Sequence, residues 1–127
     1  MSDKHLFEYA LIRVVPRVER EEFVNVGVVV CSKRQDWIAC KISIPESKLL
    51  ALDPKVDLET LNCYLDSFEK ICKGEKMGNP IAQQDAPSRF RWLTAMRSSM
   101  LQTSRPHTGL TENLDLTLEK LFEEYVA

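Results

Sequence analysis

Short runs of alternating apolar and polar positions fill the first third of the chain, which is the period of β-strands. Residues 6–15 are rich in β-branched and aromatic side chains and end before Pro16, which cannot donate to a strand ladder. A turn at 32–36 and a third run at 37–44 complete a predicted three-stranded antiparallel meander. Its second strand is expected over 22–31, with four valines on one face: Val24, Val26, Val28 and Val30.

Gly27 interrupts the second of these strands. A glycine inside a strand weakens it, because it contributes no side chain to the packing and loses much backbone entropy on folding. We therefore expect a β-bulge at this position, or a close approach of another part of the chain.

Apolar positions recur at steps of three and four residues further along the chain, and this period predicts helices. A short helix is expected over 46–52, before Asp53 and Pro54 break it. A longer helix is expected from Asp57, a good N-cap residue, to about Lys73, with Gly74 ending it. Its buried stripe would consist of Leu58, Leu61, Leu65, Phe68 and Cys72.

The rest of the chain is predicted as a loop at 75–87, two short strands at 90–93 and 99–103, and a last helix from about Thr111. Glu112 would lie in the first turn of this helix, where the helix dipole favours an acid. Its apolar face would hold Leu114, Leu118, Leu121, Phe122 and Tyr125.

The order of these elements predicts an α+β fold, with an antiparallel sheet of four to five strands that starts with the meander. Two main helices would pack on the sheet and cover one of its faces. A chain of 127 residues has enough apolar side chains for one core, so we expect a single domain over residues 1–127.

The composition is that of an ordinary globular protein, with 44% hydrophobic and 28% charged residues. A net charge of −2 disfavours binding of nucleic acid or anionic lipid over the whole surface, so any anion site must be local. No CxxC pair of the kind that zinc sites use is present, and we expect neither a metal nor a cofactor. The cysteines are better explained as small apolar thiols in a reducing cytosol: Cys31, Cys40, Cys63 and Cys72.

Two features of the sequence bear on where the protein is located in the cell. The first five residues, Met1 to His5, lack the apolar stretch of a signal peptide. The most apolar segment, residues 24–31, is far shorter than the roughly 20 residues that a membrane-spanning helix needs. We therefore expect a cytoplasmic protein without membrane contact.

The stretch from Ala86 to Leu110 contains no acidic residue, although acids outnumber bases over the whole chain. Guanidinium groups with neighbouring hydroxyls suit a phosphate or a carboxylate, because forked donors match the geometry of these anions. The alternative is a solvated edge whose arginines pair with glutamates of the helices. The polar residues of interest in this stretch are Arg89, Arg91, Arg97, Arg105, His107 and Thr108.

A second group of cations surrounds the first predicted hairpin. Arg13 lies in the middle of a strand, where a charge must find a partner or face a groove. Arg17 and Arg20 are also typical of a plain charged turn. Asn25 could orient a ligand, or it could satisfy a buried backbone group.

His107 is the only candidate that we find for a catalytic residue, because an imidazole titrates near neutral pH. A lone histidine is more often structural, however. No nucleophile elbow, phosphate loop or metal-ligand set accompanies it, and only one His–Thr pair occurs where some phosphoesterases need two. The sequence thus carries no enzyme signature.

Two motifs resemble those of the bacterial domain-of-unknown-function family 3037, and between them they reach both ends of the chain. One departure is Met96, where the family tends to place a proline. The first motif comprises Tyr9, residues 13–17, Arg20 and residues 22–28. The second comprises Arg89, Phe90, Trp92, Leu93, Ala95, Arg97, Ser98, Gln102 and residues 107–110.

The resemblance implies no established activity, but genes of this family often neighbour those of HipA-like serine/threonine kinases. This context implies a non-catalytic binding or regulatory partner of such a kinase, of the toxin–antitoxin or defence type. The alternative is a phosphate- or nucleotide-directed site, in an enzyme or a ligand sensor, built from Arg13, Asn25, Arg97 and His107. Direct nucleic-acid binding is disfavoured, because no aromatic-stacking or helix-turn-helix pattern accompanies the arginines.

Overall fold

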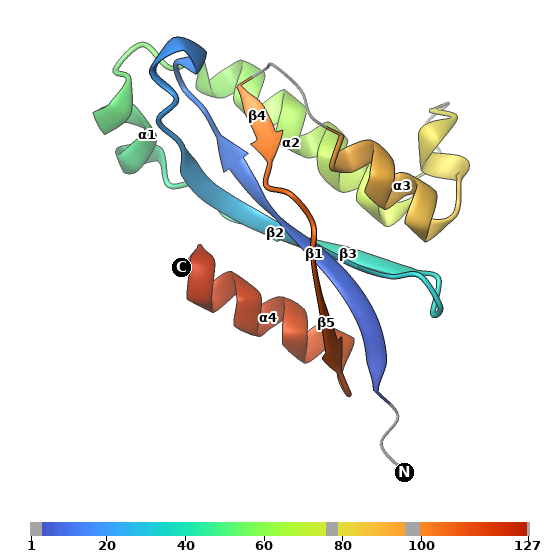
Figure 1. Ribbon diagram of the computed structural model, residues 1–127. Coiled ribbons are helices and arrows are strands. Elements are labelled where there is room, and N and C mark those ends of the chain that lie inside the picture. Colours follow the sequence, from blue (N-terminus) through green and yellow to red (C-terminus); the bar gives the residue numbers. More distant parts are fainter. Residues whose placement is uncertain (1–3, 76–78, 96–99, 127) are drawn as a thin grey trace.

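The computed structural model describes residues 4–75, 79–95 and 100–126, and the description below is confined to them. Its centre is an antiparallel sheet of five strands in the order β3-β2-β1-β4, with β5 also pairing with β1 (Figure 1). The first three strands are β1 (His5–Val14), β2 (Val24–Ser32) and β3 (Trp37–Ile42), which confirms the predicted meander.

The last two strands share one edge of β1. The short strand β4 (Leu101–Thr103) lies beside Ile12–Val14, and β5 (His107–Thr111) lies beside His5–Tyr9. β4 confirms most of the strand expected at 99–103, whose first residue, Ser99, lies outside the described residues. β5 was missed by the sequence pattern, because its five residues include two threonines and a glycine and show no clear alternation.

The predicted helices α1 (Glu46–Leu52) and α2 (Leu58–Lys73) are confirmed. The Asp57 carboxylate accepts a hydrogen bond from the Thr60 amide at 3.0 Å, and Gly74 ends α2 in the left-handed conformation. The loop that follows contains the short 3-10 turn η2 (Ile81–Gln83). Of the helices in the described ranges, none has the length and apolar character needed to cross a membrane.

The strand expected at 90–93 is wrong, because these residues belong to helix α3 (Ala86–Leu93). The Asp85 side chain caps this helix by accepting from the Ser88 amide at 2.9 Å, and Pro87 occupies the first turn, where it fits a helix. The buried residues of α3 follow a helical spacing of four and three: Ala86, Phe90 and Leu93.

The last helix, α4 (Leu114–Tyr125), begins three residues later than expected, since Thr111 still belongs to β5. The Asn113 side chain accepts from the Leu116 amide at 3.0 Å and is the N-cap. Glu112 therefore precedes the helix, and Asp115 is the acid of its first turn.

Helices cover both faces of the sheet, which corrects the expectation that only one face is covered. Helices α2 and α3 lie on one side and α4 lies on the other (Figure 1). The large core under α2 and α3 includes Ile12, Val26, Leu61 and Phe68. The smaller core under α4 consists of Phe7, Val28, Val30, Leu114, Leu118 and Phe122, with partly buried side chains around it.

The four valines of β2 do not share one face, and a β-bulge is the reason. The register shifts between Ile12, which pairs with Gly27, and Arg13, which pairs with Asn25, so that Val26 is the extra residue. Val26 consequently packs in the large core, whereas Val28 packs in the small one. A Cβ atom on Gly27 would lie 2.6 Å from the Lys41 carbonyl oxygen, so the predicted bulge and close approach at this glycine are both confirmed.

Candidate functional site

The β-bulge decides which way Asn25 points. In β1, the side chains of Phe7, Tyr9 and Leu11 pack in or against the small core, so Arg13 continues the row that faces α4. Asn25 lies directly opposite Arg13 in the antiparallel pair and therefore faces the same side. Without the extra residue, Asn25 would have been turned toward the large core.

Helix α4 ends above this part of the sheet. The side-chain amide of Asn25 donates a hydrogen bond of 3.3 Å to the backbone oxygen of Tyr125, the last residue of α4. The carbonyl end of a helix carries a partial negative charge, and the cation of Arg13 in the same row is compatible with it. Beyond this helix end the face of the sheet becomes polar. Arg13 is flanked there by Asn25 of β2 on one side and by Gln102 of β4 on the other.

Arg13 stacks on an aromatic ring. Its guanidinium carbon lies 4.1 Å from the centroid of the Phe23 ring, a cation–π contact. Burial lowers the pKa of Arg13 from its usual range, because the charged form is partly removed from water. The side chain nevertheless stays charged at any working pH, since an arginine does not lose its proton in proteins.

Two buried polar atoms in this row have no hydrogen-bond partner within the described parts of the chain, namely Nε of Arg13 and Oδ1 of Asn25. One is a donor and the other an acceptor, and the two residues are a directly opposed strand pair. Buried polar atoms are almost always satisfied in folded proteins, so an exception calls for an explanation. For Arg13, a bound ligand that accepts a hydrogen bond from Nε would be such an explanation.

A cleft of about 330 Å³ opens beside Arg13. This volume lies in the range of small-molecule sites, which are mostly apolar with a few polar groups. Glu21 stands at the end of the 3-10 turn η1 (Val18–Arg20) and is exposed. We call this feature the Arg13 cleft; its lining residues are Arg13, Val15, Val18, Glu21, Phe23 and Gln102.

His107 faces the same side of the sheet but lies outside the cleft. It pairs with Tyr9 of β1, and the centroids of their rings are 5.4 Å apart. Arg13 lies four positions after Tyr9 along the strand, which corresponds to about 13 Å. Tyr9 also stacks on Tyr125, and its pKa is raised by burial and by a hydrogen bond to Tyr125.

The remaining candidate residues are spread over the molecule. Arg17 and Arg20 are exposed and pair with Glu19 and Glu22 at 2.8 and 2.9 Å. Thr108 neighbours His107 in β5, is exposed, and pairs with Glu8, so its side chain points to the other face. Arg97 lies outside the described residues.

Arg89 is a structural residue of the opposite face. Its guanidinium donates to the backbone oxygens of Cys72, at 2.7 Å, and Ile71, at 3.3 Å, in the last turn of α2. It also donates through Nε to the Gln84 oxygen at 3.0 Å. Arg89 therefore satisfies carbonyl groups that the end of α2 leaves without helical partners.

The buried thiols are poorly suited to nucleophilic chemistry. Burial raises the pKa of Cys31 to about 12, and a hydrogen bond to Cys40 together with burial raises the pKa of Cys72. A thiol with a raised pKa stays protonated at neutral pH, and the protonated form is a weak nucleophile. Cys63 is exposed, whereas Cys72, nine residues later in α2, is buried.

Phe23, Glu21 and Gln102 complete the Arg13 cleft, and the search for charged candidates missed them as site residues. Phe23 had a usable sequence signal, since it is a large aromatic residue of the first family motif near the start of a predicted strand; in the structure 47% of its surface is exposed. Gln102 belongs to the second family motif, but its place beside Arg13 had no sequence signal, because that place depends on how β4 pairs with β1.

This geometry defines a class of protein: an α+β domain with a small cleft at one end of its sheet, lined by both polar and apolar side chains. The sequence pattern of a family described as "Protein of unknown function (DUF3037)" matches residues 9–126. The chain belongs to this family, as the two motifs had predicted. No curated protein and no solved structure is similar enough to the chain to match it.

Proposed function

We propose that this chain is a non-catalytic binding domain whose ligand site is the Arg13 cleft, and that the ligand carries a carboxylate or a phosphate. The observation that supports this proposal is the unpartnered Nε donor of Arg13, buried beside a cleft of about 330 Å³. An anion on this guanidinium would give a charge-assisted hydrogen bond in a partly dehydrated setting, where such bonds are strongest.

The other lining residues narrow the ligand class. Val15, Val18 and Phe23 provide apolar walls, so the anionic group should be attached to an apolar body. Glu21 adds a carboxylate to the same cleft and would repel a second negative charge on the ligand. The cleft therefore favours a singly charged, partly apolar ligand over a nucleoside triphosphate.

A titration followed by NMR tests this proposal. The probes are isovalerate, phenyl phosphate and inorganic phosphate. The signals are the Nε–H resonance of Arg13 in uniformly ¹⁵N-labelled protein and, for comparison with variants that lack Arg13, the backbone amide resonances of Phe23 and Gln102. We expect isovalerate or phenyl phosphate to shift this resonance at lower concentration than inorganic phosphate. Arg13→Met should weaken binding by about 10- to 100-fold, which corresponds to one charged hydrogen bond of roughly 1.5–3 kcal/mol.

Arg17→Met is the matched control, because it removes the same charge from an exposed arginine that pairs with Glu19. It should change the affinity by less than about twofold. Arg13→Lys should bind with intermediate affinity, since lysine keeps the charge but loses the forked donors and the stacking. Equal losses in the two Met variants, or no shift of the Arg13 resonance with any probe, would refute the proposal.

The enzymatic alternative places His107 beside the anion, and the spacing along β1 disfavours it. An acid–base group must come within hydrogen-bond reach of the reacting atoms, or reach them through one water. His107 pairs with Tyr9, and Tyr9 and Arg13 are about 13 Å apart along β1, which is too far for either contact. His107→Ala is therefore expected to leave the affinity of isovalerate and phenyl phosphate unchanged, and turnover of a phosphoester that His107→Ala abolishes would restore the alternative.

The proposed macromolecular partner is a HipA-like serine/threonine kinase in a bacterial cytoplasm, and this part rests on the family context alone. The expected result is co-purification of the two proteins after co-expression, with a changed rate of kinase autophosphorylation. Separate elution with unaltered kinase activity would remove this partner and leave the Arg13 cleft proposal intact.

A further inference from the structure

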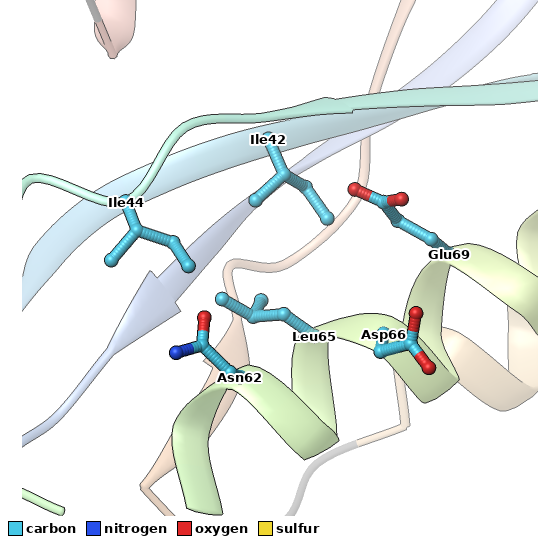
Figure 2. A pocket seen from close by; sticks show the side chains of 6 residues that line it. All are labelled: Ile42, Ile44, Asn62, Leu65, Asp66 and Glu69. Carbon is cyan, nitrogen blue, oxygen red and sulfur yellow. The ribbon is translucent and has the colours of Figure 1, made fainter. Parts of the chain in front are cut away.

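A second surface feature lies at the opposite edge of the sheet, between β3 and α2. A groove of about 320 Å³ is bounded there by the end of β3 on one side and by α2 on the other. Figure 2 shows Ile42 and Ile44 pointing toward the helix, with Leu65 below them as the floor. Leu65 is 3% exposed, so the floor of the groove is the outer margin of the large core.

One wall of the groove is polar and acidic. It is formed by a stripe of α2 with helical spacing, Asn62, Asp66 and Glu69, and Figure 2 shows the Glu69 carboxylate extended toward the strand. No cation is among the six residues that line the groove. Asp66 and Glu69 pair along the helix with Lys70 at 2.9 Å and Lys73 at 3.9 Å, but such exposed pairs are weak and easily exchanged.

The other wall is the edge of the sheet. β3 pairs with β2 from Trp37 to Ile42, and within the described residues it has no strand on its outer side. Edge strands of natural proteins are usually protected by a proline or by an outward charge. β3 contains no proline, and its one charged side chain, Lys41, is turned to α4, where it pairs with Glu119 and lies 4.8 Å from the Phe122 ring centroid.

We propose that this groove binds an extended basic segment of a partner protein, which adds to the sheet as a strand beside β3. Backbone hydrogen bonds to the free edge would hold the segment, and alternate side chains would point toward α2. The side chain over Ile42, Ile44 and Leu65 would be apolar. In the bound segment, the residues two positions before and two positions after this apolar residue would be lysine or arginine. Their side chains would face Asp66 and Glu69.

Charge favours such a partner over a second copy of this chain. If two copies paired through β3 about a twofold axis, their α2 helices would lie side by side on the same face of the joint sheet. The carboxylates of Asp66 and Glu69 would then oppose those of the second copy, and like charges at close range are destabilising.

Binding of a designed peptide tests the proposal. The probe is a labelled seven-residue peptide with lysine, valine and lysine at positions two, four and six and threonine elsewhere, and a matched peptide carries glutamate in place of lysine. We expect the lysine peptide to bind and to perturb backbone amide resonances of β3 and α2. The double variant D66K/E69K should weaken it by at least about tenfold, since two attractions become repulsions.

The control variant is E112K/E123K, which changes the net charge by the same amount on exposed residues away from the groove. It should alter the affinity by less than about twofold. The neutral variant D66N/E69Q serves as a second test that leaves the helix polar, and it should bind the peptide with intermediate affinity. All variants are first compared by circular dichroism and thermal unfolding.

Several results would overturn the proposal. Binding of the glutamate peptide with equal affinity would show that the acidic wall has no role. Equal losses in D66K/E69K and E112K/E123K, perturbations away from β3 and α2, or no binding at all would show that the groove is not the site. A dimer that D66K/E69K disrupts would assign the edge to a second copy instead.

Discussion

The two faces of the central sheet are built from the same strands but differ in what covers them. On one face, α1, α2 and α3 contribute buried side chains to a large core that includes Leu49, Leu61, Phe68 and Phe90. On the other face, α4 alone supplies the helical part of a smaller core, and the face turns polar at the row of Arg13, Asn25 and Gln102. The difference teaches that a face covered by three helices buries the larger core, whereas the face covered by α4 alone leaves room for the Arg13 cleft.

The largest effect is expected from truncations in the two cores. Phe68→Ala, in the large core, should lower the free energy of unfolding by about 3–5 kcal/mol, because it leaves a cavity among well-packed neighbours. Phe122→Ala, in the small core, should cost about 3 kcal/mol, at the low end for such changes, since fewer elements surround it. Urea unfolding measures both, and a larger loss for Phe122→Ala would reverse our ranking of the two faces.

Gly27→Ala is expected to disturb both faces at once, because the bulge at Gly27 joins them. The new Cβ would lie 2.6 Å from the Lys41 carbonyl oxygen and 2.9 Å from Cγ1 of Ile42, so backbone would have to move. A loss of about 1–3 kcal/mol in thermal or urea unfolding is expected. Gly109→Ala should cost less, as its Cβ would meet the outer ring atoms of Phe7, a side chain that can turn.

Two half-buried arginines distinguish a structural role from a binding role. Arg89→Met removes hydrogen bonds to the end of α2 and should lower the free energy of unfolding by about 1–3 kcal/mol. Arg13→Met removes a buried donor that has no partner among the described residues, so stability should be unchanged or rise by up to about 1 kcal/mol. A marked destabilisation by Arg13→Met would mean that its stacking on Phe23 serves the fold.

A pH-dependent effect is expected in alkaline solution, and it reports on the large core. Burial raises the pKa of Cys31 to about 12, so above the unfolded-state pKa, near 9, the folded protein retains a proton that the unfolded chain loses. Stability from this thiol is therefore complete below pH 9 and falls as the pH rises toward 12. The slope is about 1.4 kcal/mol per pH unit.

The free energy of unfolding, measured between pH 9 and 10.5 for the wild type and for Cys31→Ala, isolates the contribution of this thiol as the difference between the two proteins. Cys31→Ala should make the decline with pH shallower, whereas the same change at the exposed Cys63 should not. Parallel curves for the wild type and Cys31→Ala would show that the buried thiol does not carry the alkaline sensitivity.

Local signals in the chain were enough to predict the helices α1 and α2 and the three strands of the meander. Asp57 and Gly74 marked the ends of α2 because capping and left-handed geometry depend on the residue itself. The missed helix α3 carried similar signals in Asp85 and Pro87, but a short apolar run fits a strand or a helix equally well. The strand β5 had no local signal, since its conformation depends on pairing with β1.

The sequence by itself determined the fold class, the meander, the helices α1 and α2, the glycine at the bulge and membership of the family. Only the tertiary structure decided that Asn25 lies opposite Arg13 on the α4 face and that Gln102 joins them, while Arg89 caps a helix on the other side. The physical reason is that caps, turns and periodicity act over a few residues. The direction of a strand side chain, in contrast, depends on register, and one extra residue in β2 reverses it.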